Sequence, residues 1–237
     1  MTDAHTLERT INRGAFRSAL VLIAAGVLSI FLPLDAPEGP FAERMLWFSS
    51  NIDAFVIGWT VQMVMMLSLS GVLAGVAWQI RGPHPVRAFV AGTALLISVV
   101  AFIIPKFISI WSVPQMVVAS ATASAHSGVA EELLQLSNPS LAYSLTSSLD
   151  YLGFWMYAVF ALLVAQPLFR LTVGAKIAAV GFGLYGFLYH VLLVGVMARS
   201  VATEGIGGYA EALGVLLLVS VIGIAVHLRR SGATDEA

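Results

Sequence analysis

Six long apolar stretches constrain the fold of this chain more than any other feature. Each holds about 20 or more mainly apolar residues, the length that an α-helix needs to cross the hydrocarbon core of a bilayer. With 59% hydrophobic residues, 11% charged residues and a mean hydropathy of +0.90, the chain carries too much apolar surface for one aqueous core. The stretches also lack the alternating polarity of barrel strands. We therefore predict an all-α polytopic membrane protein with six transmembrane helices, at about residues 15–34, 52–80, 88–111, 149–169, 177–198 and 207–228.

The basic residues predict how these helices are oriented. If both ends of the chain are cytoplasmic, nine of the twelve Lys and Arg residues fall on the cytoplasmic side: Arg9, Arg13, Arg17, Arg81, Arg87, Arg170, Lys176, Arg229 and Arg230. Only Arg44, Lys106 and Arg199 then lie outside, as the positive-inside rule predicts. Basic residues this dispersed do not form a nucleic-acid patch. The absence of cysteine excludes disulfides and thiolate metal sites.

The longest connection, residues 113–148, lies on the outer side in this topology. Connections longer than about 12–15 residues are usually functional or disordered. Apolar residues such as Val129, Leu133 and Leu136 recur there among polar ones, which predicts a helix on the outer surface that stops at Asn138-Pro139. We expect this extracytoplasmic segment to form a lid over the bundle. An ordered loop that only closes off the helix ends is the alternative.

Two aspartates lie where the second and fourth spans are predicted to start. Ser50-Asn51-Ile52-Asp53 and Ser147-Ser148-Leu149-Asp150 both match the Ser-x-x-acid signal for a helix N-terminus. An acid there also meets the positive end of the helix dipole. Capping would therefore explain both aspartates without any ligand.

His190 is the clearest ionisable residue inside an apolar stretch. It lies about six residues, or ~9 Å, from the outer end of its span, and an ionisable group at membrane depth is a candidate functional residue. A hydrogen-bonded structural histidine is the alternative. Lys106 is predicted either to extend to the interface or to neutralise Asp53 or Asp150. The candidate ligand-binding residues of this outer half are His190, Asp150, Asp53, Lys106, Trp59, Trp155 and Tyr189.

Sequence motifs for cofactors and metals are weak. No Glu-x-x-His or His-x-x-x-His pair occurs, and the other histidines are far from His190, so we predict no metal centre, haem or other cofactor. The string Gly181-Phe182-Gly183-Leu184-Tyr185-Gly186 matches a dinucleotide fingerprint, but it lies inside an apolar span rather than after a strand. Close helix packing by small residues is the better interpretation, as for Gly71 and Gly75.

The helix four to five region carries a family resemblance. A six-helix chain with a long outer segment, and with a hairpin that runs from Asp150-Tyr151-Leu152-Gly153-Phe154-Trp155 to Leu168-Phe169-Arg170, resembles a group of uncharacterised bacterial integral membrane proteins. The resemblance implies a multi-pass protein of a bacterial plasma membrane. It implies no catalytic residues.

Two classes of function follow from these observations. The first is a small-molecule or lipid site in the outer half of the bundle, which would serve transport, sensing or lipid chemistry. The second is a non-catalytic accessory subunit of a larger membrane complex, with partner subunits or further copies of the chain packed against its helices. Membrane lipids are expected partners in either case. The two are separated by whether the candidate side chains converge on one cavity.

Overall fold

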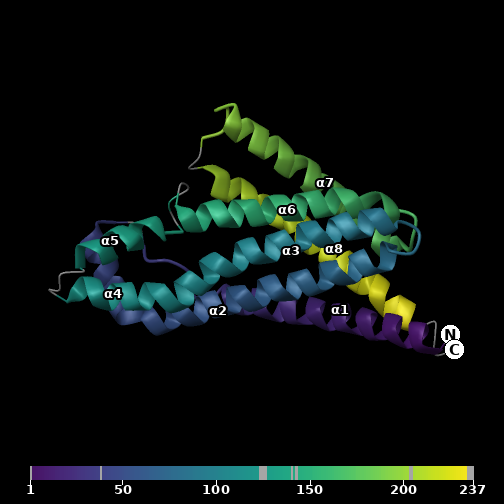
Figure 1. Cartoon of the computed structure of the whole chain (residues 1–237), viewed down its shortest axis with the longest axis horizontal. Helices are drawn as coiled ribbons and strands as arrows, with labels where there is room; N and C mark the ends of the chain where they lie inside the picture. The colour runs from purple at the N-terminus through teal and green to yellow at the C-terminus, as the bar shows by residue number, and fades with distance from the viewer. Residues whose placement is uncertain are drawn as a thin grey trace.

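The computed structural model of the chain is a bundle of long helices (Figure 1). It describes residues 2–37, 39–122, 127–139, 141, 144–202 and 205–233, without the side chains of residues 2–5, 211 and 230–233. Within this part of the chain, six helical segments are long and apolar enough to cross a membrane, which confirms the predicted spans. They are Thr6–Ser29, Phe41–Ile80, Pro85–Ala121, Leu145–Leu168, Val173–Met197 and Ile206–Arg229.

The second helix, α2 (Phe41–Ile80), is longer than predicted. It begins after Pro40 and passes through the predicted start at residue 50, so the cap assigned to Ser50 and Asp53 is wrong. Inside the helix the Ser50 hydroxyl donates to the Leu46 carbonyl at 3.4 Å instead of capping a backbone amide. With 40 residues the helix is ~60 Å long, about twice the thickness of the hydrocarbon core.

The N-terminus of α6 (Leu145–Leu168) also differs from the prediction. Its cap is Ser144, whose hydroxyl accepts a hydrogen bond from the Ser147 amide at 3.1 Å. The helix therefore starts one turn earlier than the Ser147–Asp150 signal implied. Asp150 lies in the second turn, so its carboxylate is not needed as a cap and can bind a side chain of another helix.

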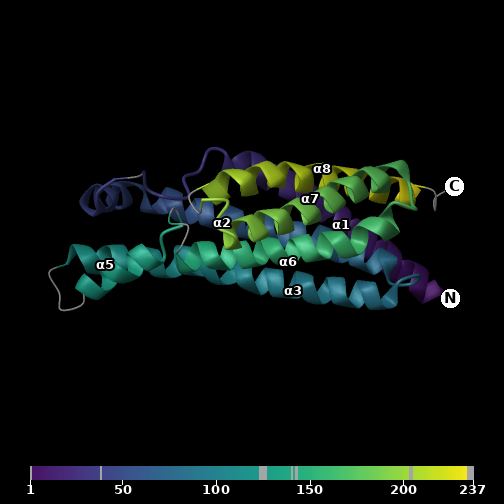
Figure 2. The ribbon, with the colours of Figure 1, turned by 90° about the horizontal axis from the view of Figure 1, so that it is seen from above.

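The predicted outer segment continues a span rather than lying across the bundle. The third span consists of α3 (Pro85–Phe107), the π-helix η1 (Ile108–Ser112) and α4 (Val113–Ala121), after which α5 (Ser127–Leu136) folds back against α4. Pro105 and Pro114 flank the π-helix, and each removes one amide donor from the helix ladder. In both views, α4 and α5 project past the start of α6 along the bundle axis (Figures 1 and 2). A lid, by contrast, would lie across the ends of the helices. The stop at Asn138-Pro139 is confirmed, although residues 123–126, 140, 142 and 143 of the segment lie outside the described part.

Two ends of the bundle are used as references below. Helix α1 (Thr2–Ser29) begins, and helix α8 (Ile206–Ala233) finishes, at one end of the bundle, which we term the terminal end (Figure 1). The opposite end, which carries α4, α5 and the first turns of α2, is the distal end. The expectation that the terminal end is cytoplasmic stays a prediction.

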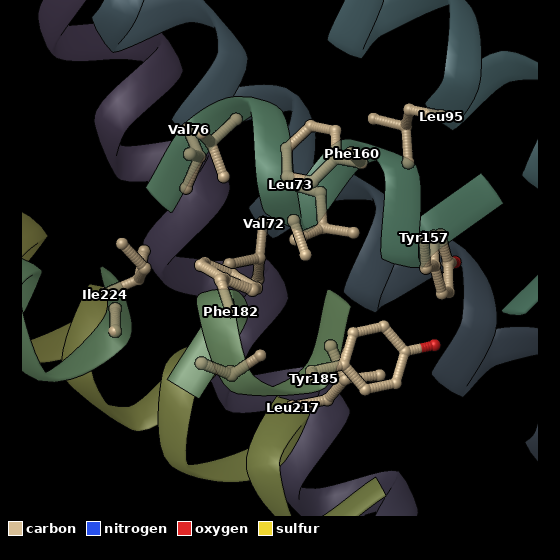
Figure 3. Close-up of a cluster of buried hydrophobic side chains, with 14 of the residues drawn as sticks. Val72, Leu73, Val76, Leu95, Tyr157, Phe160, Phe182, Tyr185, Leu217 and Ile224 are labelled. Atoms are coloured by element: carbon tan, nitrogen blue, oxygen red, sulfur yellow. The ribbon is translucent and has the colours of Figure 1, made fainter. Parts of the chain in front are cut away.

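The core lies where the helices pack side by side. It contains side chains from α2, α3, α6, α7 (Val173–Met197) and α8, including Val72, Leu73, Leu95, Tyr157, Phe160, Phe182, Tyr185, Leu217 and Ile224 (Figure 3). Small residues bring the backbones together. A Cβ at Gly186 would lie 2.7 Å from Leu162, and one at Gly181 would overlap the hydroxyl of Ser220. The interpretation of this glycine string as packing is therefore confirmed at Gly181 and Gly186, whereas Gly183 has room for a methyl group.

Candidate functional site

A buried ion pair joins α3 to α6 in the distal half of the bundle. The Lys106 ammonium donates to the Asp150 carboxylate at 3.1 Å, with 7% and 23% of the two side chains exposed. The pairing follows from close helix contact, because Gly153 has no side chain and lets the Phe102 ring approach. The two helices run antiparallel, so Lys106, one turn after Phe102, meets Asp150, one turn before Gly153. Of the two partners predicted for Lys106, the structure selects Asp150.

Aromatic rings surround the Lys106 ammonium. It lies 4.6 Å from the centroid of Phe102 and 5.8 Å from that of Trp59. Trp59 is buried, and its indole N–H donates to the Leu34 carbonyl at 2.9 Å, which ties α2 to the α1–α2 connection. Rings of this kind stabilise a cation that has been removed from water. Lys106, Asp150 and Trp59 are thus three predicted site residues that the structure brings together.

Tyr189 is close to this group but is used for helix packing. Its ring is 1% exposed, and its hydroxyl donates to the Tyr151 carbonyl at 3.0 Å. One turn earlier, Tyr185 donates to the Phe154 carbonyl at 2.9 Å. Both bonds run from α7 to α6. They fix the register of the two helices rather than leave a phenol available to a ligand.

His190 lies on a different face from the ion pair. Its Nδ1 is 2.7 Å from the Gly186 carbonyl, and its Nε2 is 3.2 Å from the indole nitrogen of Trp155. Because a carbonyl only accepts and an indole N–H only donates, the arrangement requires the neutral Nδ1–H tautomer. Trp155 is 40% exposed on the outer surface of the bundle. Both nitrogens of His190 are therefore engaged, and this geometry agrees with the structural alternative for this histidine.

Asp53 lies apart from the other predicted site residues. It is exposed on α2, and it forms no ion pair with any residue that the structure describes. The seven candidates thus occupy separate places: the ion-pair region with Tyr189 beside it, the His190–Trp155 surface, and Asp53. None of them lines the cavities described below, which are formed by other residues.

One of these cavities lies among the distal helices, between the start of α2 and the α4–α5 pair. The sequence analysis expected a site in this half of the bundle, but it did not predict the residues that line this cavity. Its volume is about 190 Å³. Its lining combines polar residues, among them Arg44, Asp35, Gln135 and Asn138, with apolar and aromatic ones. The full lining is Asp35, Gly39, Phe41, Arg44, Met45, Phe48, Phe55, Val113, Leu134, Gln135, Ser137, Asn138 and Pro139.

Arg44 is the central polar group of this distal cavity. Its guanidinium donates to the Asp35 carboxylate at 2.8 Å and to the Ala36 carbonyl at 3.2 Å, with 14% of the side chain exposed. A guanidinium has five N–H groups, so donors remain for a further acceptor. The sequence analysis used Arg44 only as a topological charge. Two local features of the sequence could have marked Arg44 as a site residue. It lies in the first turn of the helix that follows Pro40, and Asp35 lies in the connection just before that helix.

A line of aromatic rings connects the distal cavity to the ion pair. Phe48 and Phe55 line the cavity with ring centroids 5.2 Å apart, and Phe55 and Trp59 are 6.2 Å apart. Spacings of seven and four residues place all three on one face of α2. Trp59 then contacts Lys106. A displacement of the cavity wall therefore has a contiguous packed route to α3 and α6.

A second polar group, which the sequence analysis overlooked, lies near the terminal end. His227 is buried, with Nδ1 at 2.8 Å from the Thr172 hydroxyl and Nε2 at 3.2 Å from the Gln79 side-chain oxygen. Gln79 in turn donates to Asn12 at 3.3 Å. These bonds connect α1, α2 and α8 to the N-cap of α7. The partners are distant in sequence, so no local motif marks them.

Within the described residues no group of three or more His, Cys, Asp or Glu is arranged to hold a metal ion. Comparison of the chain with protein-family models, with curated proteins and with solved structures gives no match.

Proposed function

We propose that this chain is a ligand-sensing membrane protein whose binding site is the distal cavity. The observation that supports the proposal is the mostly buried Arg44–Asp35 pair, which lines a cavity of about 190 Å³ together with Phe48 and Phe55. Binding sites commonly combine an apolar lining with a few fixed polar groups. The site lies in the same half of the bundle as the site expected from the sequence, with Arg44 and Asp35 in place of His190 and Asp53.

The lining determines the class of ligand. Arg44 and Asp35 neutralise each other, so an uncharged head with an acceptor and a donor is favoured over an ion. Gln135 carries an amide that suits the same head. Phe48 and Phe55 favour an aromatic or compact apolar body. An engineered cavity of roughly 150 Å³ holds benzene, so the expected ligand is a small amphipathic molecule about the size of a substituted ring.

Sensing is favoured over catalysis by the bonding of the ionisable groups in the bundle and by the aromatic contacts that lead away from the cavity. Among the described ionisable groups of the bundle interior, Lys106 and Asp150 neutralise each other, and His190 and His227 each have both ring nitrogens engaged. By contrast, Phe48, Phe55 and Trp59 offer a packed route from the ligand to the ion pair between α3 and α6. In this proposal the ligand alters how these helices pack, and a partner reads the change.

Benzamide tests the site because it has an aromatic ring and an amide head. In detergent-solubilised protein, saturation-transfer difference NMR should detect benzamide bound to the wild type. Ser137→Phe fills the cavity and should abolish the signal above the micelle background. Ser49→Phe makes the same change on an exposed part of α2 outside the lining and should retain it. Equal signals from both variants would show that benzamide does not bind there and would contradict the proposal.

The accessory-subunit alternative is favoured by two observations. The side chains predicted from the sequence line none of the cavities described above, and such scattering is the outcome expected for a subunit. The second observation is an exposed apolar surface on the distal helices. Leu46, Val118 and Val129 expose more than half of their surfaces on the distal helices. These helices extend past the length that the hydrocarbon core covers, and exposed apolar residues in water often mark a protein interface. Substituting Leu46 and Val118 by Ser should lower the mass of the gently extracted protein if it is a subunit. An unchanged mass together with unchanged benzamide binding would favour the sensor.

A further inference from the structure

A second cavity, on the outer surface between α2 and α3, has the form of a groove. Its volume is about 680 Å³, and it lies toward the terminal end, whereas the distal cavity lies at the other end of the bundle. Small residues of both helices make it hollow. Its lining is Ser70, Gly71, Ala74, Ala77, Trp78, Arg81, Pro85, Ala88, Phe89, Gly92, Leu95, Leu96 and Val99.

The dimensions of the groove match one lipid chain. Its lining on α3 runs from Pro85 to Val99, which is about 21 Å at 1.5 Å per residue. One leaflet contributes roughly half of a hydrocarbon core of about 30 Å. At about 30 Å³ for a water-sized group, the volume accommodates ~20 such groups. A single acyl chain with its ester group therefore fits along the groove.

A cation lies at the end of the groove nearest the terminal end of the bundle. The Arg81 guanidinium stacks on Trp78, 3.6 Å from the ring centroid, and donates to the Trp78 carbonyl at 2.7 Å. Within the described part of the chain it pairs with no carboxylate. Further basic residues gather near the same end, namely Arg9, Arg13, Arg87, Arg170, Lys176 and Arg229, whereas Glu8 is the one acid there whose side chain is described. This end of the bundle therefore attracts anions.

We propose that the α2–α3 groove binds one anionic phospholipid, with an acyl chain along the groove and the phosphate on Arg81. Basic sites between transmembrane helices bind acidic headgroups in this way. Trp78 is suited to the interface because its ring packs on apolar groups at the level of the headgroups. The site does not involve the distal cavity, so it stands or fails independently of the proposed sensing function.

The experiment measures which lipid the full-length protein retains. Protein is equilibrated with equal amounts of phosphatidylglycerol and phosphatidylcholine with matched chains, and the bound lipid is counted by native mass spectrometry. The wild type should retain one phosphatidylglycerol with about a fivefold preference, as expected for one Arg at the surface. Arg81→Gln should reduce the preference to about one. Arg170→Gln, an exposed arginine at the same end, should keep it.

A second pair of variants tests the groove itself. Gly92→Leu fills the groove, and a Cβ at Gly92 meets no atom within 4 Å, so the bundle can accept it. It should reduce retention of both lipids. Gly214→Leu makes the same change in α8, where a Cβ also meets nothing within 4 Å, and should have no effect. Equal retention of the two lipids by the wild type would overturn the proposal. So would equal effects of Arg81→Gln and Arg170→Gln, or of the two leucine variants.

Discussion

The buried ion pair between Lys106 and Asp150 gives a prediction whose size can be worked from the structure. Removing one partner of a buried pair costs about 3–5 kcal/mol, because the remaining charge has no partner. Asp150 is 23% exposed, so water and protonation relieve part of this cost. We expect Lys106→Met to destabilise the protein by about 2–3 kcal/mol. Methionine retains the apolar stem that packs on Phe102 and Trp59, so the loss reports the charge rather than a cavity.

The double variant makes the prediction specific. Lys106→Met with Asp150→Asn removes both charges, so its stability should return to within about 1 kcal/mol of the wild type. The coupling energy between the two sites should therefore be about 2 kcal/mol or more. Arg170→Met, which changes an exposed arginine, serves as the control and should cost less than about 0.5 kcal/mol.

Stability is measured by titrating the protein in mixed micelles with sodium dodecyl sulfate and following far-UV circular dichroism. This signal reports the whole bundle, whereas tryptophan fluorescence would report Trp59 beside the mutated residue. If the two single variants add up in the double variant, the residues do not interact in the folded protein. That result would refute the assignment of Lys106 to Asp150 and the route from the distal cavity that passes through this pair.

Three further predictions test other parts of the structure. Gly181→Ala should destabilise the protein by about 1–3 kcal/mol in the same titration, because its Cβ would overlap Ser220. Gly183→Ala should cost much less, because its Cβ would lie 3.8 Å from Ala165. Equal costs would contradict the close contact of α7 and α8. His227→Leu should be more destabilising than His190→Leu by about 1–2 kcal/mol, because it leaves the partly buried side-chain oxygen of Gln79 without its donor. The reverse order would give His190 the larger structural role. Because the chain has no cysteine, Gly82→Cys and Gly128→Cys can be labelled singly with an impermeant maleimide, and we expect modification from the cytoplasmic and outer sides respectively; labelling from the same side would refute the predicted orientation.

The sequence predicted the number and the approximate positions of the spans because the bilayer allows few alternatives. A backbone in hydrocarbon must satisfy its hydrogen bonds within its own segment, so an apolar run of sufficient length becomes a helix. The end of α5 near Asn138-Pro139 and the packing role of Gly181 and Gly186 are equally local properties. They depend on backbone chemistry and side-chain size, which can be read along the chain.

Helix boundaries outside the membrane were harder to predict. Where α2 and the third span leave the hydrocarbon, apolar length no longer sets their limits. The Ser-x-x-acid pattern from Ser50 to Asp53 can occur inside a helix as well as at a helix start. Here it lies inside a helix, because α2 already begins after Pro40. Similarly, Ser144 rather than Ser147 caps α6 because the preceding chain arrives there.

The tertiary structure alone decided which polar side chains meet. An apolar span shows no strong polar face from which its rotation about its own axis can be read. The contact of Phe102 with Gly153 fixes that rotation for α3 and α6, and it is this contact that brings Lys106 to Asp150. The packing of α7 against α6, set by Tyr185 and Tyr189, brings His190 to Trp155 on the outer surface. The sequence therefore determined that the chain has six helices long and apolar enough to cross a membrane, while the packing of distant helices decided where its charges, its cavities and its candidate sites lie.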